Sequence, residues 1–189
     1  NGQVKPGDTV AIVGSAPIGL AALLTAQFYS HAEIIMIDMD DNRLNVAKTF
    51  GATQTINSRN TDVAEKINSL TNGKGVDTAI EAVGTPDTFE LCALIIAPGG
   101  RIANIGVHGK SATLHLETLW SKNITITTRL VDTVTTPMLL KTVQSKKLDP
   151  NNLITHHFKL SQVVEAYETF GNAAKEKAPD PRRHYASPE

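Results

Sequence analysis

The sequence is poor in several features, and each shortage excludes a class of protein. Its 189 residues include one cysteine, which excludes a disulfide framework and any zinc site built from several cysteines. Positive and negative charges nearly cancel, at 18 against 19, so no basic footprint indicates nucleic acid or an acidic membrane as a partner. No apolar run approaches the roughly 20 residues that span a bilayer. We therefore expect a cytoplasmic protein that binds neither nucleic acid nor membrane.

What the sequence does contain is a regular alternation of short β-branched runs and helical patterns. Its length suits one domain, since domains commonly have roughly 100–200 residues. Because each parallel strand needs a crossover, the alternation predicts an α/β fold, a Rossmann-type doubly wound parallel sheet of about six strands with helices on both faces. The predicted strands are 9–13, 33–38, 53–56, 76–83, 101–107 and 123–128. The predicted helices are 17–29, 40–50, 63–72, 85–96, 136–147 and 161–172.

A glycine-rich turn follows the first predicted strand, at residues 14–19, Gly-Ser-Ala-Pro-Ile-Gly. In the dinucleotide fingerprint G-x-G-x-x-G, the first glycine makes the tight turn and the third lets helix and strand pack closely. The middle glycine lets the backbone approach the pyrophosphate. Gly14 and Gly19 fit, but Ala16 holds the middle position, where a methyl group crowds the phosphate. Alone the turn is a weak signal, and a plain strand-to-helix connection is the alternative.

Asp38, at the end of the second predicted strand, strengthens this interpretation. It lies about 20 residues after the turn, where the fingerprint places an acid that binds a ribose hydroxyl. A carboxylate there repels a 2′-phosphate, so NAD(H) is favoured over NADP(H). The alternative is a solvated acid, or a cap for the helix that starts near Asp40.

Taken together, several segments resemble the cofactor domain of zinc-dependent medium-chain alcohol dehydrogenases, with the secondary alcohol dehydrogenases most similar. The resemblance extends from about Val4 to Lys177 and implies an NAD-binding domain over 1–177, followed by an irregular tail over 178–189. The segments that carry it are Val4–Val10 with Gly14–Gly19, Asp38–Ala52, Gly75–Gly84 and Ala97–Val107.

The resemblance also implies cofactor contacts at matched positions. Asp38 would hold the adenosine ribose with Arg43 nearby, and the Val83 side chain would line the adenine slot. Backbone at 105–107 would face the nicotinamide. For Arg43 a solvated helix position is the alternative, and Ile105 and Val107 can also be core residues of a buried strand. The candidate cofactor-binding residues are Gly14, Ala16, Pro17, Ile18, Gly19, Asp38, Arg43, Val83, Ile105, Gly106 and Val107.

Zinc ligands are what this chain lacks. In the resembled family, Cys, His and an acidic residue of a separate, preceding domain hold the catalytic zinc, and four cysteines bind a structural zinc in many members. We therefore expect no metal site and no catalytic residue in this chain. Cys92 is predicted to be a small core residue. His156 and His157 are adjacent, so on a strand they point to opposite faces and make a poor chelating pair.

The chain therefore looks like the cofactor domain of a longer enzyme. Its first residues do not resemble a signal peptide and match the start of that domain. Residues 178–189 are rich in proline and charge, and we expect them to be disordered or to form a surface arm. An appended tail or an altered reading frame would explain their departure from the family pattern.

Three functions compete at this point. The first is the NAD(H)-binding domain of an alcohol dehydrogenase, inactive by itself. The second is a nucleotide-binding or dimerisation module without catalysis, because the predicted strand 123–128 is β-branched and lacks a lysine or proline to protect an edge. In the resembled family such edges pair, which implies a homodimer. The third is a methyltransferase, but residues 81–84 contain no recognisable catalytic motif of that class. The chain also lacks the Tyr-x-x-x-Lys arrangement of short-chain dehydrogenases.

Overall fold

The structure is a computed structural model that describes residues 1–131 and 133–172. Its centre is a six-stranded sheet in which every neighbouring pair of strands is parallel. The strands are β1 (Thr9–Val13), β2 (Glu33–Asp38), β3 (Gln54–Asn57), β4 (Val76–Glu81), β5 (Ile96–Asn104) and β6 (Thr125–Thr128). The helices are α1 (Pro17–Ala26), α2 (Asp41–Thr49), α3 (Val63–Leu70), α4 (Pro86–Ile95), α5 (Leu116–Leu119), α6 (Thr136–Gln144) and α7 (Val163–Gly171).

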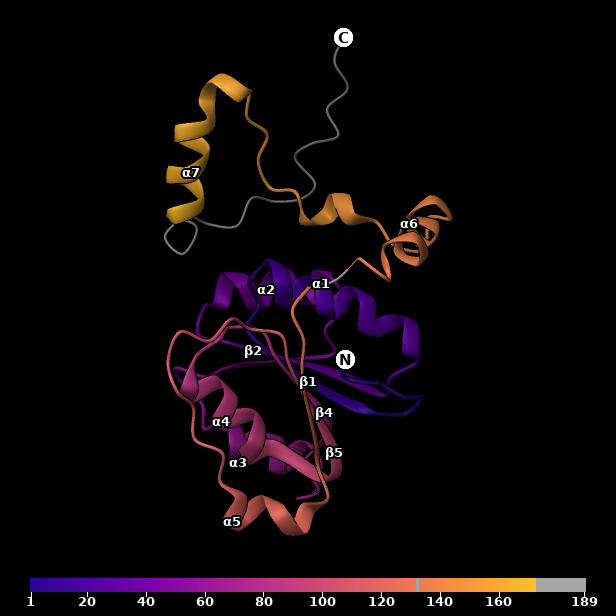
Figure 1. Cartoon of the computed structure of the whole chain (residues 1–189), viewed down its shortest axis with the longest axis vertical. Helices are drawn as coiled ribbons and strands as arrows, with labels where there is room; N and C mark the ends of the chain where they lie inside the picture. The colour runs from indigo at the N-terminus through magenta and orange to yellow at the C-terminus, as the bar shows by residue number, and fades with distance from the viewer. Residues whose placement is uncertain (132, 173–189) are drawn as a thin grey trace. The chain divides into compact units, whose positions relative to one another are not determined.

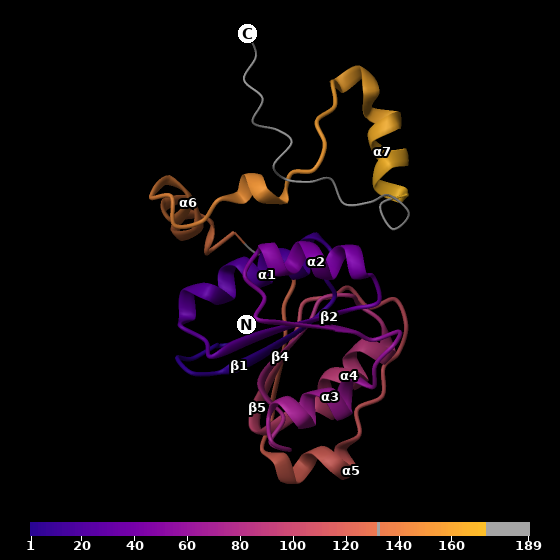
Figure 2. The same ribbon diagram turned by 180° about the vertical axis from the view of Figure 1, so that it is seen from behind.

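The strand order is β3-β2-β1-β4-β5-β6, so the chain winds outward from β1 in one direction and then from β4 in the other. Helices α1 and α2 cover one face of the sheet, while α3 and α4 cover the opposite face (Figures 1 and 2). This is the predicted doubly wound Rossmann architecture. The direction of winding reverses between β1 and β4, and in such sheets ligands bind beyond the carboxyl ends of the strands at this reversal.

The central strands are apolar along their length because helices bury both of their faces. In β2 the four residues Ile34–Ile37 are at most 1% exposed, and the burial of β1 is similarly complete from Val10 to Val13. Leu23 of α1 and Ile67 of α3 add fully buried side chains from the two helical layers. Each such side chain contributes about 1.5–3 kcal/mol on leaving water, so this core fixes where the strand ends lie.

The fifth strand differs from the prediction at both ends. It begins at Ile96 rather than 101, since Val76 pairs with Ile96 and Thr78 with Arg101. The extra residues of β5, Pro98 to Gly100, form an irregularity, and Gly99 has a φ of +75°. The strand also ends at Asn104, so the backbone of 105–107 belongs to a loop. Residues 98–100, which lie between the predicted helix and the predicted strand, are therefore an irregular part of β5.

Other predicted elements extend beyond the observed ones. Helix α1 ends at Ala26 and gives way to a 3-10 turn at Gln27–Tyr29, where Phe28 is 42% exposed. Strand β6 starts at Thr125 because Asn123 adopts a left-handed φ of 52° as the C-cap of the preceding 3-10 turn. Helix α5 and this turn, Trp120–Lys122, are not predicted from the sequence, since four residues are too few for a periodic pattern.

The chain forms two compact units, Asn1–Thr133 and Val134–Glu189. The first unit contains the whole sheet, and the described part of the second contains α6, α7 and two 3-10 segments, Pro150–Leu153 and Leu160–Gln162. The boundary that we predict between 1–177 and the tail 178–189 lies outside the described residues. Across the described chain, no helix is both long and apolar enough to cross a membrane.

Candidate functional site

The carboxyl ends of four strands meet at one edge of the sheet. Val13 of β1 pairs with Ile37 of β2 on one side and with Glu81 of β4 on the other, and Glu81 pairs in turn with Asn104 of β5. The segments that follow these strands therefore lie side by side at the reversal of winding. They carry all of the predicted cofactor-binding residues except Asp38, the last residue of β2, and Arg43, which lies in the first turn of α2.

The two outer glycines of the turn are required by its geometry. Gly14 has a φ of +104°, and its N–H donates to the carbonyl oxygen of Ile37 at 2.8 Å. A Cβ at Gly19 would overlap the carbonyl oxygen of Gly14, so α1 packs directly on the turn. Both residues therefore perform the steric roles of the first and third fingerprint glycines.

Ala16 departs from the fingerprint without straining the backbone. It is the N-cap of α1, with φ −74° and ψ 176°, and makes no side-chain capping hydrogen bond. Pro17 at the first helical position has no N–H to satisfy. The N–H groups of the first turn, which have no partner within a helix, and the positive end of the helix dipole favour an anion here.

An unpartnered polar atom lies beside this helix end. The Ser15 hydroxyl is buried and has no hydrogen-bond partner among the described residues. A buried hydroxyl usually has a partner, and a phosphate oxygen would supply one. This atom and the turn's glycine geometry therefore fit a dinucleotide pyrophosphate.

Asp38 is tied directly to the turn. Its Oδ2 accepts a hydrogen bond from the Ser15 backbone N–H at 2.7 Å, and its Oδ1 accepts from the Asp40 N–H at 3.0 Å. The capping role falls to Asp40, whose Oδ1 accepts from the N–H groups of Asn42 and Arg43 at 2.8 and 3.4 Å. Asp38 is therefore not the cap of α2, and its carboxylate lies at the turn.

Apolar side chains surround this polar centre and face solvent. Ile18, Val83 and Val107 are 58%, 47% and 84% exposed. Val107 is thus not a core residue, whereas Ile105 is partly buried. A Cβ at Gly14 would meet the Val83 side chain, so Val83 adjoins the turn. Exposed apolar residues gathered around a polar centre are what a bound ligand could cover.

Three further polar residues at this edge were not singled out from the sequence. Glu81 is fully buried at the end of β4, Asn104 is the last residue of β5, and His108 lies in the loop that follows β5. The signal for Glu81 was available, because a carboxylate that ends a buried apolar strand must have partners. The contact between His108 and Glu81 depends on the tertiary fold and has no local signature.

Titratable side chains elsewhere do not assemble a metal site in the described part of the chain, where no group of three or more His, Cys, Asp or Glu residues gathers. Cys92 is fully buried, as predicted. Burial, with a smaller contribution from the negative charge of Glu81, raises the pKa of its thiol. His156 and His157 lie in a loop rather than on a strand.

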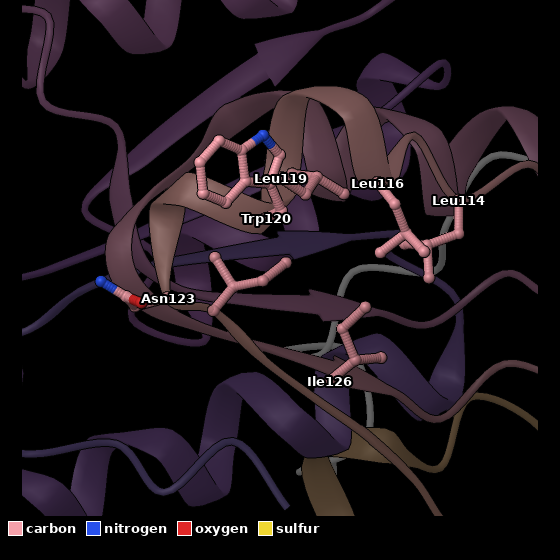
Figure 3. Close-up of a pocket in the computed structure, with 7 residues that line it drawn as sticks. Leu114, Leu116, Leu119, Trp120, Asn123 and Ile126 are labelled. Atoms are coloured by element: carbon pink, nitrogen blue, oxygen red, sulfur yellow. The ribbon is translucent and has the colours of Figure 1, made fainter.

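A second surface lies at the β6 edge of the sheet. An open groove of about 330 Å³ runs between α5 and β6, and its side chains project into it from both elements (Figure 3). Trp120 and Leu116 on its rim are 76% and 60% exposed. The residues that line the groove are Leu114, Leu116, Leu119, Trp120, Asn123, Ile124 and Ile126.

The sheet order, with a glycine turn at its reversal of winding, places the protein in the Rossmann class of dinucleotide-binding folds. The family model "Zinc-binding dehydrogenase" matches residues 17–145, and the chain belongs to this family. Among curated relatives, an alcohol dehydrogenase of Cupriavidus necator is 35% identical over 179 residues, which are 91% of this chain and 48% of the relative. An NADP-dependent isopropanol dehydrogenase of Thermoanaerobacter brockii is 34% identical, over 83% of this chain and 46% of the relative.

Solved structures agree with this assignment. The apo form of zinc-dependent alcohol dehydrogenase 2 from Streptococcus pneumonia is 55% identical, with a TM-score of 0.90 over 92% of this chain and 51% of that one. An Escherichia coli CFT073 alcohol dehydrogenase complexed with NADH is 26% identical, with a TM-score of 0.84 over 90% and 50% of the two chains. The chain thus spans about half the length of the relatives that it matches.

Proposed function

We propose that this chain is the NAD(H)-binding half of a zinc-dependent alcohol dehydrogenase, which oxidises an alcohol to an aldehyde or ketone. The observation that carries the proposal is the hydrogen bond between the Ser15 backbone and Asp38. It joins the phosphate turn to a ribose-binding acid in the arrangement that a dinucleotide requires. Family membership and an NADH complex of a related dehydrogenase support it.

In this proposal each candidate residue has a physical task. The N-terminus of α1, with Ala16, Pro17, Ile18 and the Ser15 hydroxyl, binds the pyrophosphate. Asp38 accepts hydrogen bonds from the adenosine ribose through lone pairs that its two backbone donors leave free. When bound, the nicotinamide supplies hydride-transfer chemistry.

The remaining residues orient the two ends of the cofactor. Val83 packs on the adenosine end, while the backbone at Ile105, Gly106 and Val107 borders the nicotinamide. Arg43, in the first turn of α2 beside the end of β2, lies within the same region and adds a positive charge near the adenosine end. These residues bind and orient the cofactor, and none of them moves a proton.

The preference for NAD(H) over NADP(H) rests on Asp38. Its carboxylate repels a 2′-phosphate, and Asp40 and Asp41 add negative charge close by. Since one of the relatives is named NADP-dependent, the two cofactors need to be compared directly.

The test is calorimetry of the 189-residue chain with NADH and with NADPH. We expect NADH to bind more tightly, and we expect Asp38→Asn to weaken NADH binding about tenfold through loss of a charged acceptor. The same variant should narrow the difference between NADH and NADPH. Asp87→Asn, in the first turn of α4, is the matched control and should leave both affinities unchanged. Equal binding of NADH by Asp38→Asn and by the unmodified chain would overturn the assignment.

We also propose a homodimer formed through residues 123–128 and the neighbouring groove. The support is an edge strand without lysine or proline, Thr125–Thr128, beside the exposed Trp120 and Leu116. If NADH does not bind and dimers still form, the non-catalytic dimerisation module becomes the better function.

We propose a cytoplasmic location, with which a single buried free cysteine is compatible.

A further inference from the structure

The buried residue Glu81 connects loop 82–84, which contains Val83, with loop 105–107, which borders the proposed nicotinamide site. Its Oε1 accepts hydrogen bonds from the N–H groups of Val83 and Gly84 at 2.9 and 2.8 Å, and from the Thr88 hydroxyl at 2.7 Å. Its carbonyl oxygen accepts from the N–H groups of Ile105 and Gly106 at 2.9 and 3.1 Å. One residue therefore holds loop 82–84 through its side chain and loop 105–107 through its backbone.

The second carboxylate oxygen of Glu81 is not hydrogen-bonded to any of the described residues. This atom, Oε2, is buried, and His108 Nε2 lies 3.4 Å away from it. The same nitrogen is 2.8 Å from Asn104 Oδ1, which can only accept, so Nε2 carries a hydrogen. That hydrogen is donated to Asn104 Oδ1, while Glu81 Oε2 lies beside the same nitrogen without a hydrogen bond to it.

Asn104 extends this network to the loop backbone. Its Nδ2 donates to the carbonyl oxygen of Gly106 at 3.1 Å, while its Oδ1 is held by His108. The imidazole also meets the Phe89 ring edge-on, with the ring centroids 6.2 Å apart. His108 is thus fixed from α4 and from β5, and through Asn104 it sets the direction of the Gly106 carbonyl.

The packing leaves the loops little freedom to adjust. A Cβ at Gly106 would overlap both Glu81 Oε2 and the Gly84 backbone, and a Cβ at Gly84 would overlap the Val107 carbonyl. Because the two backbones are in direct contact around a buried carboxylate, a change at one polar partner must shift the loop.

From this geometry we propose that Glu81 and His108 are positioning residues, a buried carboxylate–imidazole pair that holds the 105–107 backbone in place against the nicotinamide end of the cofactor. The inference rests on the proposed NAD(H) function. His108 does not touch the adenosine half of the site, so its effect is confined to the nicotinamide half. The His108 imidazole therefore contributes to the affinity for NADH and not to that for ADP-ribose, which has the same adenosine and pyrophosphate groups. Glu81 also holds the Val83 loop at the adenosine end.

The test uses His108→Phe, which keeps a ring against Phe89 but removes Nε2, and His108→Gln, which keeps a nitrogen donor. Calorimetry of the 189-residue chain should show NADH binding weakened about fivefold by His108→Phe, the usual effect of one lost hydrogen bond. His108→Gln should recover most of the loss. ADP-ribose affinity should be unchanged in both variants.

Glu81→Gln completes a double-mutant cycle with His108→Phe. Its Oε1 can still accept the three donors, but its amide N–H groups face His108 Nε2, so we expect weaker NADH binding and a non-additive double variant. His115→Phe is the matched control, since its imidazole pairs with the exposed Glu117 at 2.8 Å, away from the strand ends.

The possible failures are distinguishable. If the unmodified chain binds neither NADH nor ADP-ribose, the proposed function fails. If it binds both, and His108→Phe binds NADH as tightly as the unmodified chain or loses ADP-ribose binding equally, the positioning role is wrong. Additivity of Glu81→Gln and His108→Phe would likewise contradict a coupled pair.

Discussion

At the scale of single residues, the turn at 14–19 contains two glycines that the backbone geometry requires and one alanine that it does not. Position 14 requires glycine because of its positive φ, and position 19 requires glycine because a Cβ there would overlap the carbonyl oxygen of Gly14. Ala16 is not fixed in this way, since its backbone is extended and its methyl group is only partly buried. We therefore expect a substitution of Ala16 to change the affinity for the cofactor and not the stability of the fold.

Ala16→Gly should bind NADH about three- to tenfold more tightly, because removing the methyl group lets the backbone approach the pyrophosphate. Its unfolding should change little. The contrasting variant is Gly19→Ala, which should lower the free energy of unfolding by about 1–3 kcal/mol through overpacking. Calorimetry and urea unfolding measure the two effects. An Ala16→Gly variant that binds NADH less well would show that the methyl group does not crowd the phosphate.

Cys92 provides a prediction about pH. Burial raises the pKa of its thiol in the folded protein, so the folded state keeps a proton that the unfolded chain loses. The stability that this group contributes is complete below about 8.5, the ordinary pKa of a thiol, and is lost as pH rises above it. Urea unfolding at pH 7 and pH 10 should show a smaller alkaline loss for Cys92→Ala than for the unmodified chain. Equal losses would contradict this prediction.

At the scale of elements, the proposed cofactor site depends on the ends of the strands, and the proposed dimer depends on the edge strand. Parallel pairing brings the ends of β1, β2, β4 and β5 into one row, which gathers residues from four distant parts of the chain. The same sheet leaves β6 with a single neighbour. A strand with one open edge beside exposed apolar side chains is typical of association sites, and it is at this edge that we propose the dimer to form.

Trp120→Glu should shift the proposed dimer toward monomer, because a charge replaces an exposed indole on the rim of the groove. Since Trp120 is 76% exposed, the fold of the monomer should be retained. Light scattering across a concentration series measures the change, with circular dichroism to confirm folding. Trp120→Phe is the conservative control and should dimerise. If the unmodified chain is monomeric even at high concentration, the proposed dimer is wrong.

At the scale of the whole molecule, the chain spans about half of its relatives. Its described residues gather no cluster of three or more metal-ligating side chains, whereas the resembled enzymes need zinc to polarise the alcohol. The residues at the strand ends fit cofactor binding, which is the part of the proposed reaction that we assign to this chain.

We predict no alcohol oxidation by the 189-residue chain, with or without added zinc, under conditions in which NADH binding is measurable. The assay follows NADH absorbance with a panel of primary and secondary alcohols, and calorimetry on the same sample serves as the positive control. Zinc-dependent turnover by the purified chain would contradict the prediction.

The sequence alone determined the class of fold, because alternating periodicity and buried apolar strands admit few arrangements other than a parallel sheet. It also identified the turn at 14–19 and Asp38, since both depend on local spacing. Tertiary structure decided what spacing does not encode. It placed Val107 in an exposed loop by ending β5 at Asn104, and it gave the capping role to Asp40. It also brought His108 to Glu81, because a buried carboxylate finds its partners across neighbouring strands and not along the chain.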